Sequence, residues 1–228
     1  MEQLKEFMKR TTPFQDLSDD EITPFLSIIS KKKFKEKNMI FLHDTPITHV
    51  YFSASGKVKV YRNDMSGKEQ IISVKQPGDM FPHVGFFRNG NYPANAQAIE
   101  DTELYSIAII EFEEVLIANP RLSIKMFRVL GDQIVQQQQR LEEMALRSTN
   151  ERILLLLLRL SETHGESEKD GWVKLNTRFT NSDLANMIGT TRESVNRMIS
   201  QLRKEQAIKL IDSQFLIFPK LIKSKLFN

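Results

Sequence analysis

The stretch FTNSDLANMIGTTRESVNRMISQL, residues 179–202, determines how the C-terminal part of this chain is expected to fold. Two places in it have a hydroxyl residue followed three positions later by a carboxylate, Thr180 with Asp183 and Thr190 with Glu193. In such a capping box, each side chain bonds a backbone amide left free at the start of a helix. The stretch therefore predicts two helices separated by a very short turn.

Three positions in this stretch have the spacing of a helix-turn-helix. Ala185 is small enough to let two helices approach, and Gly189 can adopt the positive φ of a tight turn. Val195 is a β-branched residue that would fill the space between the helices. The spacing predicts a helix-turn-helix whose turn is at residues 188–190.

The predicted second helix has an apolar face and a polar face. The apolar residues are Val195, Met198, Ile199 and Leu202. The candidate DNA-binding residues are Thr190, Thr191, Arg192, Glu193, Asn196 and Arg197. Arginine can donate two bonds to guanine and glutamate can accept one from cytosine in the major groove. Two alternatives stay open, namely that Glu193 only caps the helix and that the arginines form an ordinary solvated surface.

Short strands are expected on both sides of this motif. The apolar runs between Ile208 and Phe218 are separated by Asp212 and Ser213, a pattern typical of a β-hairpin, and residues 172–175 form a further strand pattern. Together they predict a winged helix-turn-helix, whose wing contacts the DNA backbone.

The N-terminal half has the pattern of a β-domain. From Phe34 to about Ile110, short apolar stretches alternate with turn residues, at a spacing of about ten residues that is typical of a jelly roll. Strands and helices do not alternate, which argues against a doubly wound parallel sheet. The expected fold class is α+β, with an N-terminal β-roll and a C-terminal winged helix-turn-helix.

A long helix is expected between the two parts, ending near Arg147. Its residues with alternating spacings of three and four are Phe127, Leu130, Ile134, Gln137, Leu141 and Met144. This is the a/d repeat of a two-stranded coiled coil and predicts a dimer interface. The alternative is a helix packed on its own barrel, and Gln137 could fix the register or contact a ligand.

A link at residues 147–150 leads to another helix from Glu151 to about Leu160, whose run of leucines at 154–158 indicates a buried element. The predicted domains are a β-roll sensor domain at 1–118, a dimerisation helix at 119–147 and a winged helix-turn-helix domain at 148–228.

Composition limits the chemistry of the chain. It has no cysteine, which excludes disulfides, thiolate zinc sites and cysteine-ligated iron–sulfur clusters. Residues 1–149 carry 19 Lys and Arg against 20 Asp and Glu, whereas residues 150–228 carry 13 against 9. This C-terminal basic excess fits either a nucleic-acid module or an ordinary basic surface. The charged start MEQLKEFMKR and the absence of an apolar run of about 20 residues predict no membrane segment and a cytoplasmic location.

The order of β-roll, long helix and winged helix resembles the family of the cyclic-AMP receptor protein and Fnr (Crp/Fnr) over almost the whole chain. Residues 17–21 are similar to its opening helix, residues 51–58 to its central hairpin and residues 191–197 to its recognition helix. The resemblance implies a homodimeric transcription regulator that binds double-stranded DNA at a palindrome and, if it is an activator, RNA polymerase.

The resemblance also suggests the DNA target. Arg192, Glu193 and Arg197 match the base-contacting positions of the family, which implies a TGTGA-like half-site. Members that bind a TTGAT-like half-site usually lack an arginine at the Arg192 position, so its presence favours the first kind of site.

The stretch at residues 78–98 resembles the phosphate-binding cassette of the family but departs from it. In members that bind cyclic AMP, a glutamate holds the ribose and an arginine with a serine holds the cyclic phosphate. The matching positions here carry His83, Pro93 and Ala94. Losing such a partner of a buried anion typically costs about 2 to 4 kcal/mol, so the expected effector is not cyclic AMP, or there is none.

The candidate effector pocket comprises His83, Val84, Gly85, Phe86, Pro93, Ala94, Asn95, Gln133, Gln137 and Gln138. A cyclic-nucleotide-responsive regulator with a non-standard pocket remains an alternative. His83 lies between phenylalanines, a setting more typical of a structural histidine than of a haem ligand, so no cofactor or metal is expected.

A cupin-like metal enzyme is the remote alternative. Its metal site needs clustered ligands such as His-x-His, which the sequence lacks. A helix-turn-helix that serves only protein contacts is a third possibility, against which the arginines of the second helix argue.

Overall fold

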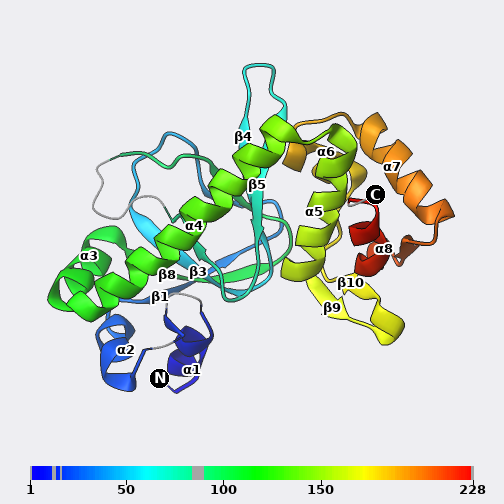
Figure 1. Ribbon diagram of the computed structural model, residues 1–228. Helices are drawn as coiled ribbons and strands as arrows, with labels where there is room; N and C mark the ends of the chain where they lie inside the picture. The colour runs from blue at the N-terminus through cyan, green and yellow to red at the C-terminus, as the bar shows by residue number, and fades with distance from the viewer. Residues whose placement is uncertain (1, 12–13, 16, 84–89, 227–228) are drawn as a thin grey trace. The chain divides into compact units, whose positions relative to one another are not determined.

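The computed structural model describes residues 2–11, 14–15, 17–83 and 90–226. The chain forms two compact units, Met1–Gln136 and Gln137–Asn228, and the boundary between them falls inside the long helix α4 (Pro120–Leu146) (Figure 1). Among the described residues, no helix combines the length and the apolar character that a membrane crossing requires.

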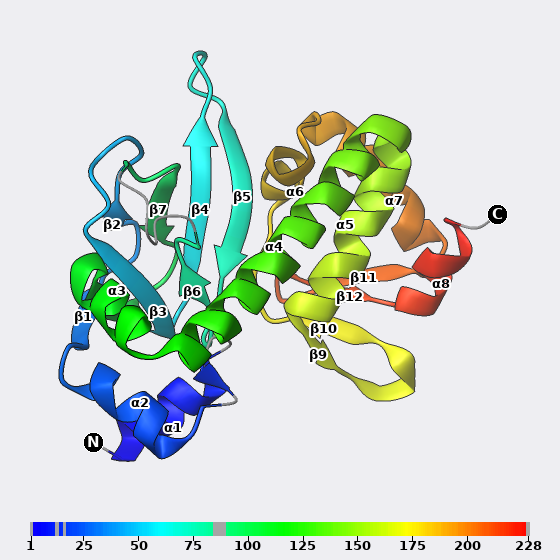
Figure 2. The same ribbon diagram turned by 60° about the vertical axis from the view of Figure 1, so that its left-hand side comes forward.

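The first unit contains two four-stranded antiparallel sheets, which confirms the predicted β-roll. One sheet has the order β1 (Ser30–Phe34), β8 (Thr102–Ala108), β3 (His49–Ser55) and β6 (Met80–Phe81). The other has the order β2 (Met39–Phe41), β7 (Asn95–Ala98), β4 (Val58–Asn63) and β5 (Glu69–Lys75). Strands distant in the chain pair with each other, and the hairpin of β4 and β5 extends well beyond its neighbours (Figure 2).

Alternating side chains of β3 build the two cores of this unit. Tyr51 faces the space between the sheets, where it packs with residues of both, while Val50 and Phe52 face the opposite side. On that side they pack with residues of three short helices and of the start of α4. The helices are α1 (Glu2–Arg10), α2 (Asp19–Leu26) and α3 (Ile109–Ala118).

A helix was expected at residues 17–21 from the family resemblance, and α2 starts there with a capping box of Ser18 and Glu21 that was not predicted. Helix α3 was not predicted, because its apolar sequence continues directly from β8.

In its described residues, the second unit contains the end of α4, four further α-helices and a small sheet. Its helices are α5 (Thr149–Thr163), α6 (Asn181–Ile188), α7 (Arg192–Lys204) and α8 (Pro219–Ser224). Its strands are β9 (Gly165–Ser167), β10 (Val173–Leu175), β11 (Ile208–Ile211) and β12 (Gln214–Ile217), in the order β11, β12, β10, β9. Strands β11 and β12 pair antiparallel around Asp212 and Ser213, both at positive φ, so the predicted wing hairpin is confirmed.

The predicted link at residues 147–150 is shorter in the structure. Ser148 caps α5, accepting from the amide of Glu151 while the Glu151 carboxylate accepts from the amide of Ser148. This capping box starts the helix at Thr149. The helix also continues to Thr163, beyond the predicted end near Leu160, and most of its leucines are buried as expected.

Candidate nucleic-acid interface

The turn between α6 and α7 is built around Gly189. This residue is in the left-handed region, with φ 66° and ψ 44°, which glycine adopts without the steric cost of a Cβ. The amide of Thr190 donates to the carbonyl of Ala185 over 3.0 Å and closes the turn. The two helices are therefore joined as the spacing of Ala185 and Gly189 predicts.

One of the two predicted capping boxes is correct and the other is wrong. Thr180 and Asp183 cap α6 in both directions. Helix α7, however, is capped by Thr191, whose hydroxyl accepts from the amide of Ser194 over 3.2 Å. Because the amide of Thr190 is used in the turn, the helix starts one residue later than predicted, and Glu193 is not the partner of a cap at Thr190.

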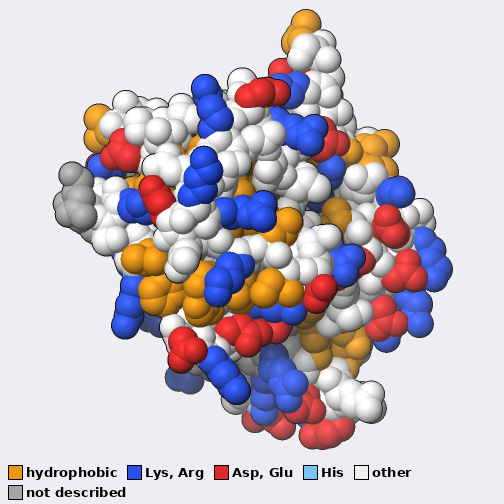
Figure 3. All heavy atoms as spheres, turned by 90° about the vertical axis from the view of Figure 1, so that its right-hand side faces the viewer, with side chains coloured by type: hydrophobic (Ala, Val, Ile, Leu, Met, Phe, Trp, Pro, Cys, Tyr) orange, Lys and Arg blue, Asp and Glu red, His pale blue; other side chains and the backbone are white. Residues whose placement is uncertain are grey.

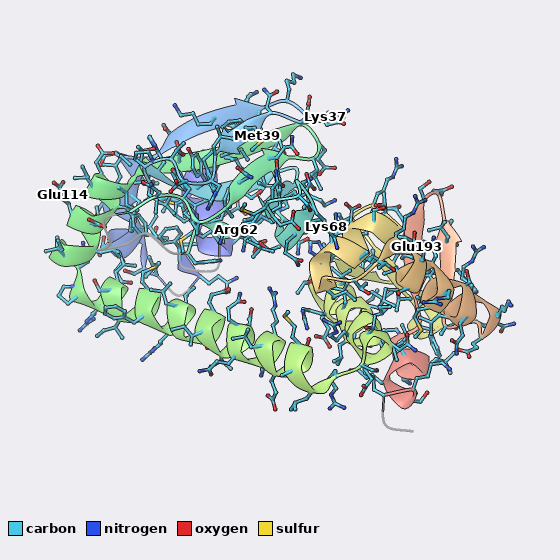
Figure 4. The ribbon with its side chains drawn as sticks, turned by 90° about the horizontal axis from the view of Figure 1, so that it is seen from above. Lys37, Met39, Arg62, Lys68, Glu114 and Glu193 are labelled. Atoms are coloured by element: carbon cyan, nitrogen blue, oxygen red, sulfur yellow. The ribbon has the colours of Figure 1, made fainter. Side chains whose placement is uncertain are left out.

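Helix α7 has one buried face and one exposed face. Its buried residues are Val195, Met198, Ile199 and Leu202, as predicted. Thr191, Arg192, Glu193 and Arg197 are exposed, whereas Thr190 and Asn196 are half-buried. Figure 4 labels Glu193 on this helix. The predicted DNA-binding residues thus lie together in the turn and in the first two turns of α7.

The first turns of α7 carry both signs of charge. The backbone amide of Glu193 and then the hydroxyl of Thr191 lower the pKa of the Glu193 carboxyl, and Arg192 and Arg197 lower it further. Nη2 of Arg197 lies 3.5 Å from Oγ of Ser194. The N-terminal end of α7 therefore presents the ionised carboxylate of Glu193 between Arg192 and Arg197. The carboxylate can accept a hydrogen bond from cytosine, and the arginines can donate to guanine.

A shallow groove follows the exposed face of α7, and residues of polar and charged type surround it. It is lined by Asn196, Arg197, Ser200, Gln201 and Lys204. The last three were not predicted as site residues, although their spacing from Arg197 places them on the same helical face. Figure 3 shows that Lys and Arg side chains are interspersed with Asp and Glu on one face of the molecule, so charge alone does not mark this interface.

The structure describes seven of the ten candidate effector residues. Val84, Gly85 and Phe86 lie outside the described residues. Ala94 is buried, Pro93 is exposed, and Asn95 accepts a bond from the amide of His43.

His83 is half-buried, with Nε2 3.2 Å from Nζ of Lys75. Burial first, and then the charge of Lys75, lower the pKa of His83 to about 3, so the imidazole is neutral.

Aromatic side chains fill the space between the two sheets of the β-roll. Phe41 stacks on Tyr92 at 3.9 Å between ring centroids, and Tyr51 stacks on Phe81 at 5.7 Å. The hydroxyl of Tyr92 accepts from the amide of His49 and donates to its carbonyl. Sequence reasoning did not assign these residues, which pack with Val58, Ala96 and Leu104 in one apolar cluster.

The long helix α4 exposes the predicted repeat. Phe127, Ile134, Leu141 and Met144 are 60–65% exposed, Leu130 is half-buried and Gln137 is exposed. Within the first unit, α4 packs on the β-roll through Leu122 and Met126 instead. The effector candidate Gln133 is half-buried and Gln138 is exposed.

Histidine, aspartate and glutamate are the side chains of this cysteine-free chain that metals prefer as ligands. Within the part of the chain that the structure describes, no group of three or more His, Asp or Glu side chains is placed to hold a metal ion.

Two family models match the chain. Residues 31–119 match the cyclic nucleotide-binding domain, and residues 151–219 match the Crp-like helix-turn-helix domain. The matched ranges correspond to the β-roll with α3 and to the region from α5 to the wing.

Relatives and solved structures agree with these models. The chain is 27% identical to the anaerobic regulatory protein of Bacillus subtilis over 90% of its own length and 87% of that protein. It is 23% identical to the CRP-like cAMP-activated global transcriptional regulator of Mycobacterium tuberculosis, over 94% and 95% of the two chains. The structure of FixK2 from Bradyrhizobium japonicum has the same fold, with a TM-score of 0.75 at 18% identity, covering 86% of this chain and 96% of that one. With its β-roll, helix-turn-helix and wing in this order, the chain belongs to the Crp/Fnr family of DNA-binding transcription regulators.

Proposed function

We propose that this regulator acts as a homodimer that binds a TGTGA-like palindrome, with an effector other than cyclic AMP or with no effector. The observation that carries the proposal is the exposed set Arg192, Glu193 and Arg197 at the start of α7, above a buried apolar face. A helix anchored in this way can enter the major groove with its N-terminal side chains at the base edges.

Base recognition is tested with Arg197→Ala. Binding of a TGTGA palindrome and of a scrambled duplex is measured by fluorescence anisotropy at fixed salt, because phosphate contacts make affinity depend on salt. A bidentate arginine contributes roughly 1 to 3 kcal/mol of discrimination per half-site, so the variant should lose its preference for the palindrome. Arg203→Ala is the matched control, since Arg203 is exposed in the last turn of the same helix. An unchanged preference in Arg197→Ala would refute base contact by this residue.

The exposed repeat of α4 supports the dimer. Four large apolar side chains of this repeat, Phe127, Ile134, Leu141 and Met144, face solvent on a single chain. Covering each such side chain on association contributes about 1.5 to 3 kcal/mol from the hydrophobic effect. A second copy of α4 presents the same repeat and would give two recognition helices related by a twofold axis, which matches a palindrome.

The β-roll supports an effector other than cyclic AMP. Ala94 and Pro93 stand where the family resemblance expects a serine and an arginine, and aromatic rings fill the neighbouring interior. The second candidate is a cyclic-nucleotide-responsive regulator with a non-standard pocket. It is favoured by the match of residues 31–119 to the cyclic nucleotide-binding domain and by the cAMP-activated relative of M. tuberculosis.

Three further features complete the proposal. The protein acts by binding and not by catalysis, like the curated regulators that it resembles. As a DNA-binding regulator it would work in the cytoplasm and, if it activates transcription, would contact RNA polymerase. Metal analysis of the purified protein, with activity assays on any metal found, tests the cupin-like alternative.

A further inference from the structure

A hydrogen bond between two asparagines ties the recognition helix α7 to the first helix of the motif. Asn181 is the first residue of α6, and its Nδ2 donates to Oδ1 of Asn196 over 2.5 Å. Both side chains are half-buried, and Asn196 lies in the second turn of α7. The bond therefore fixes the direction in which the oxygen of the Asn196 carboxamide points.

Asn196 also lines the groove on α7 together with Arg197. A carboxamide carries an acceptor oxygen and an NH₂ donor on different sides of the same carbon. Because the oxygen of Asn196 faces Asn181, its N–H donors are left for a partner in the groove. We propose that Asn181 is a positioning residue that turns the donors of Asn196 toward DNA and thereby sets the base preference at one position of the half-site.

The chemistry of the preference follows from the major-groove edges. Guanine offers the acceptors O6 and N7 and thymine offers O4, whereas cytosine offers a donor at N4. Adenine forms a bidentate pair with a carboxamide only when both the oxygen and the nitrogen of the carboxamide are free. Held by Asn181, Asn196 should favour guanine or thymine over cytosine at the base pair that it faces. This inference rests on the proposed base contact by α7.

The test reverses the direction of the hydrogen bond between residues 181 and 196. In Asn181→Asp the carboxylate can only accept, so Asn196 must turn its NH₂ toward residue 181 and its oxygen toward the groove. Wild type, Asn181→Asp and Asn196→Ala are measured by fluorescence anisotropy on duplexes that carry each base pair at each half-site position. Asn196→Ala should flatten the preference at one position. At that position Asn181→Asp should move the preference toward cytosine or adenine, by roughly three- to tenfold for one exchanged hydrogen bond.

A charge control separates orientation from repulsion. Ser182→Asp adds the same negative charge to the neighbouring residue and leaves Asn181 in place. It should weaken binding to all duplexes alike, because phosphate repulsion carries no sequence information. A changed preference in Asn181→Asp but not in Ser182→Asp supports the positioning role.

Two results would overturn the inference and can be told apart. A wild-type protein that does not distinguish the palindrome from scrambled DNA refutes base contact by α7, and the inference fails with it. A wild-type protein that distinguishes them, with the same base profile in Asn181→Asp, refutes only the orientation of Asn196 by Asn181.

Discussion

Nη1 of Arg152 in α5 donates to the carbonyl oxygen of Ile188 at the end of α6, over 3.0 Å. The two residues are 36 positions apart, and the bond connects the core helix of the second unit to the turn of the helix-turn-helix. The last carbonyls of a helix have no partner within the helix, so a cation at this end both satisfies an acceptor and interacts favourably with the helix dipole.

Replacing Arg152 should destabilise the DNA-binding unit. In Arg152→Leu, the carbonyl of Ile188 loses its partner in a half-buried site, which typically costs about 1 to 3 kcal/mol. Urea denaturation followed by circular dichroism measures the change. Arg178→Leu is the control, because Arg178 is exposed, and it should stay within about 0.5 kcal/mol of wild type. Equal free energies of unfolding for the two variants would contradict a supporting role of Arg152.

A charge in the exposed repeat of α4 should separate the proposed dimer. Ile134→Lys places an ammonium group in the middle of the repeat, where a second copy would bury it without a partner. Sedimentation velocity should show a monomer for Ile134→Lys and a dimer for wild type. Because Ile134 is 60% exposed on one chain, the variant should still fold.

The control for this experiment is Gln139→Lys, at an exposed position outside the repeat, which should remain dimeric. A dimer of undiminished stability in Ile134→Lys would place the interface elsewhere.

The parts of the fold set by local signals could be predicted from the sequence. The wing hairpin follows from turn residues between two apolar runs, and the helix-turn-helix follows from Gly189 and the capping box at Thr180. The sequence alone does not show which residue caps α7, because Thr190 and Thr191 are adjacent and both carry a hydroxyl group. The amide of Thr190 instead bonds the carbonyl of Ala185 at the end of α6, so Thr190 belongs to the turn and Thr191 caps α7.

Long-range contacts explain what sequence reasoning missed. Helix α3 follows β8 without a break in apolar character, and its helical form depends on burying Phe112 and Leu116 against the sheet and its covering helices. The role of Asn181 depends on a partner in another helix. No local signal in the sequence identifies this pair, because its two asparagines are 15 positions apart and meet only when the two helices have packed.

Acid should weaken the β-roll through His83. Its pKa is about 3 in the folded state, so below the unfolded pKa of about 6.5 the unfolded chain binds a proton that the folded chain does not. The free energy of unfolding should therefore fall as the pH decreases through this window, by about 2 kcal/mol between pH 7 and pH 5 from this residue alone. Urea denaturation at the two pH values measures this fall in the free energy of unfolding. The fall should be about 2 kcal/mol smaller in His83→Gln than in wild type.

His43→Gln is the matched control, because His43 is an exposed histidine of the same unit, and it should keep the acid sensitivity of wild type. If His83→Gln and wild type lose equal stability between the two pH values, the imidazole is not held neutral by burial.

Cyclic AMP should bind no more tightly than its neutral nucleoside. The phosphate of a buried cyclic nucleotide needs a cation and hydroxyl donors, and the positions that resemble such contacts hold Pro93, which is exposed, and the buried methyl group of Ala94. Titration calorimetry with cyclic AMP, cyclic GMP and adenosine compares the three ligands at equal concentration. The expected result is weak or no heat with all of them and no advantage from the phosphate. Micromolar or tighter binding of cyclic AMP, with much weaker binding of adenosine, would show that the phosphate finds other donors. It would then favour the cyclic-nucleotide-responsive alternative.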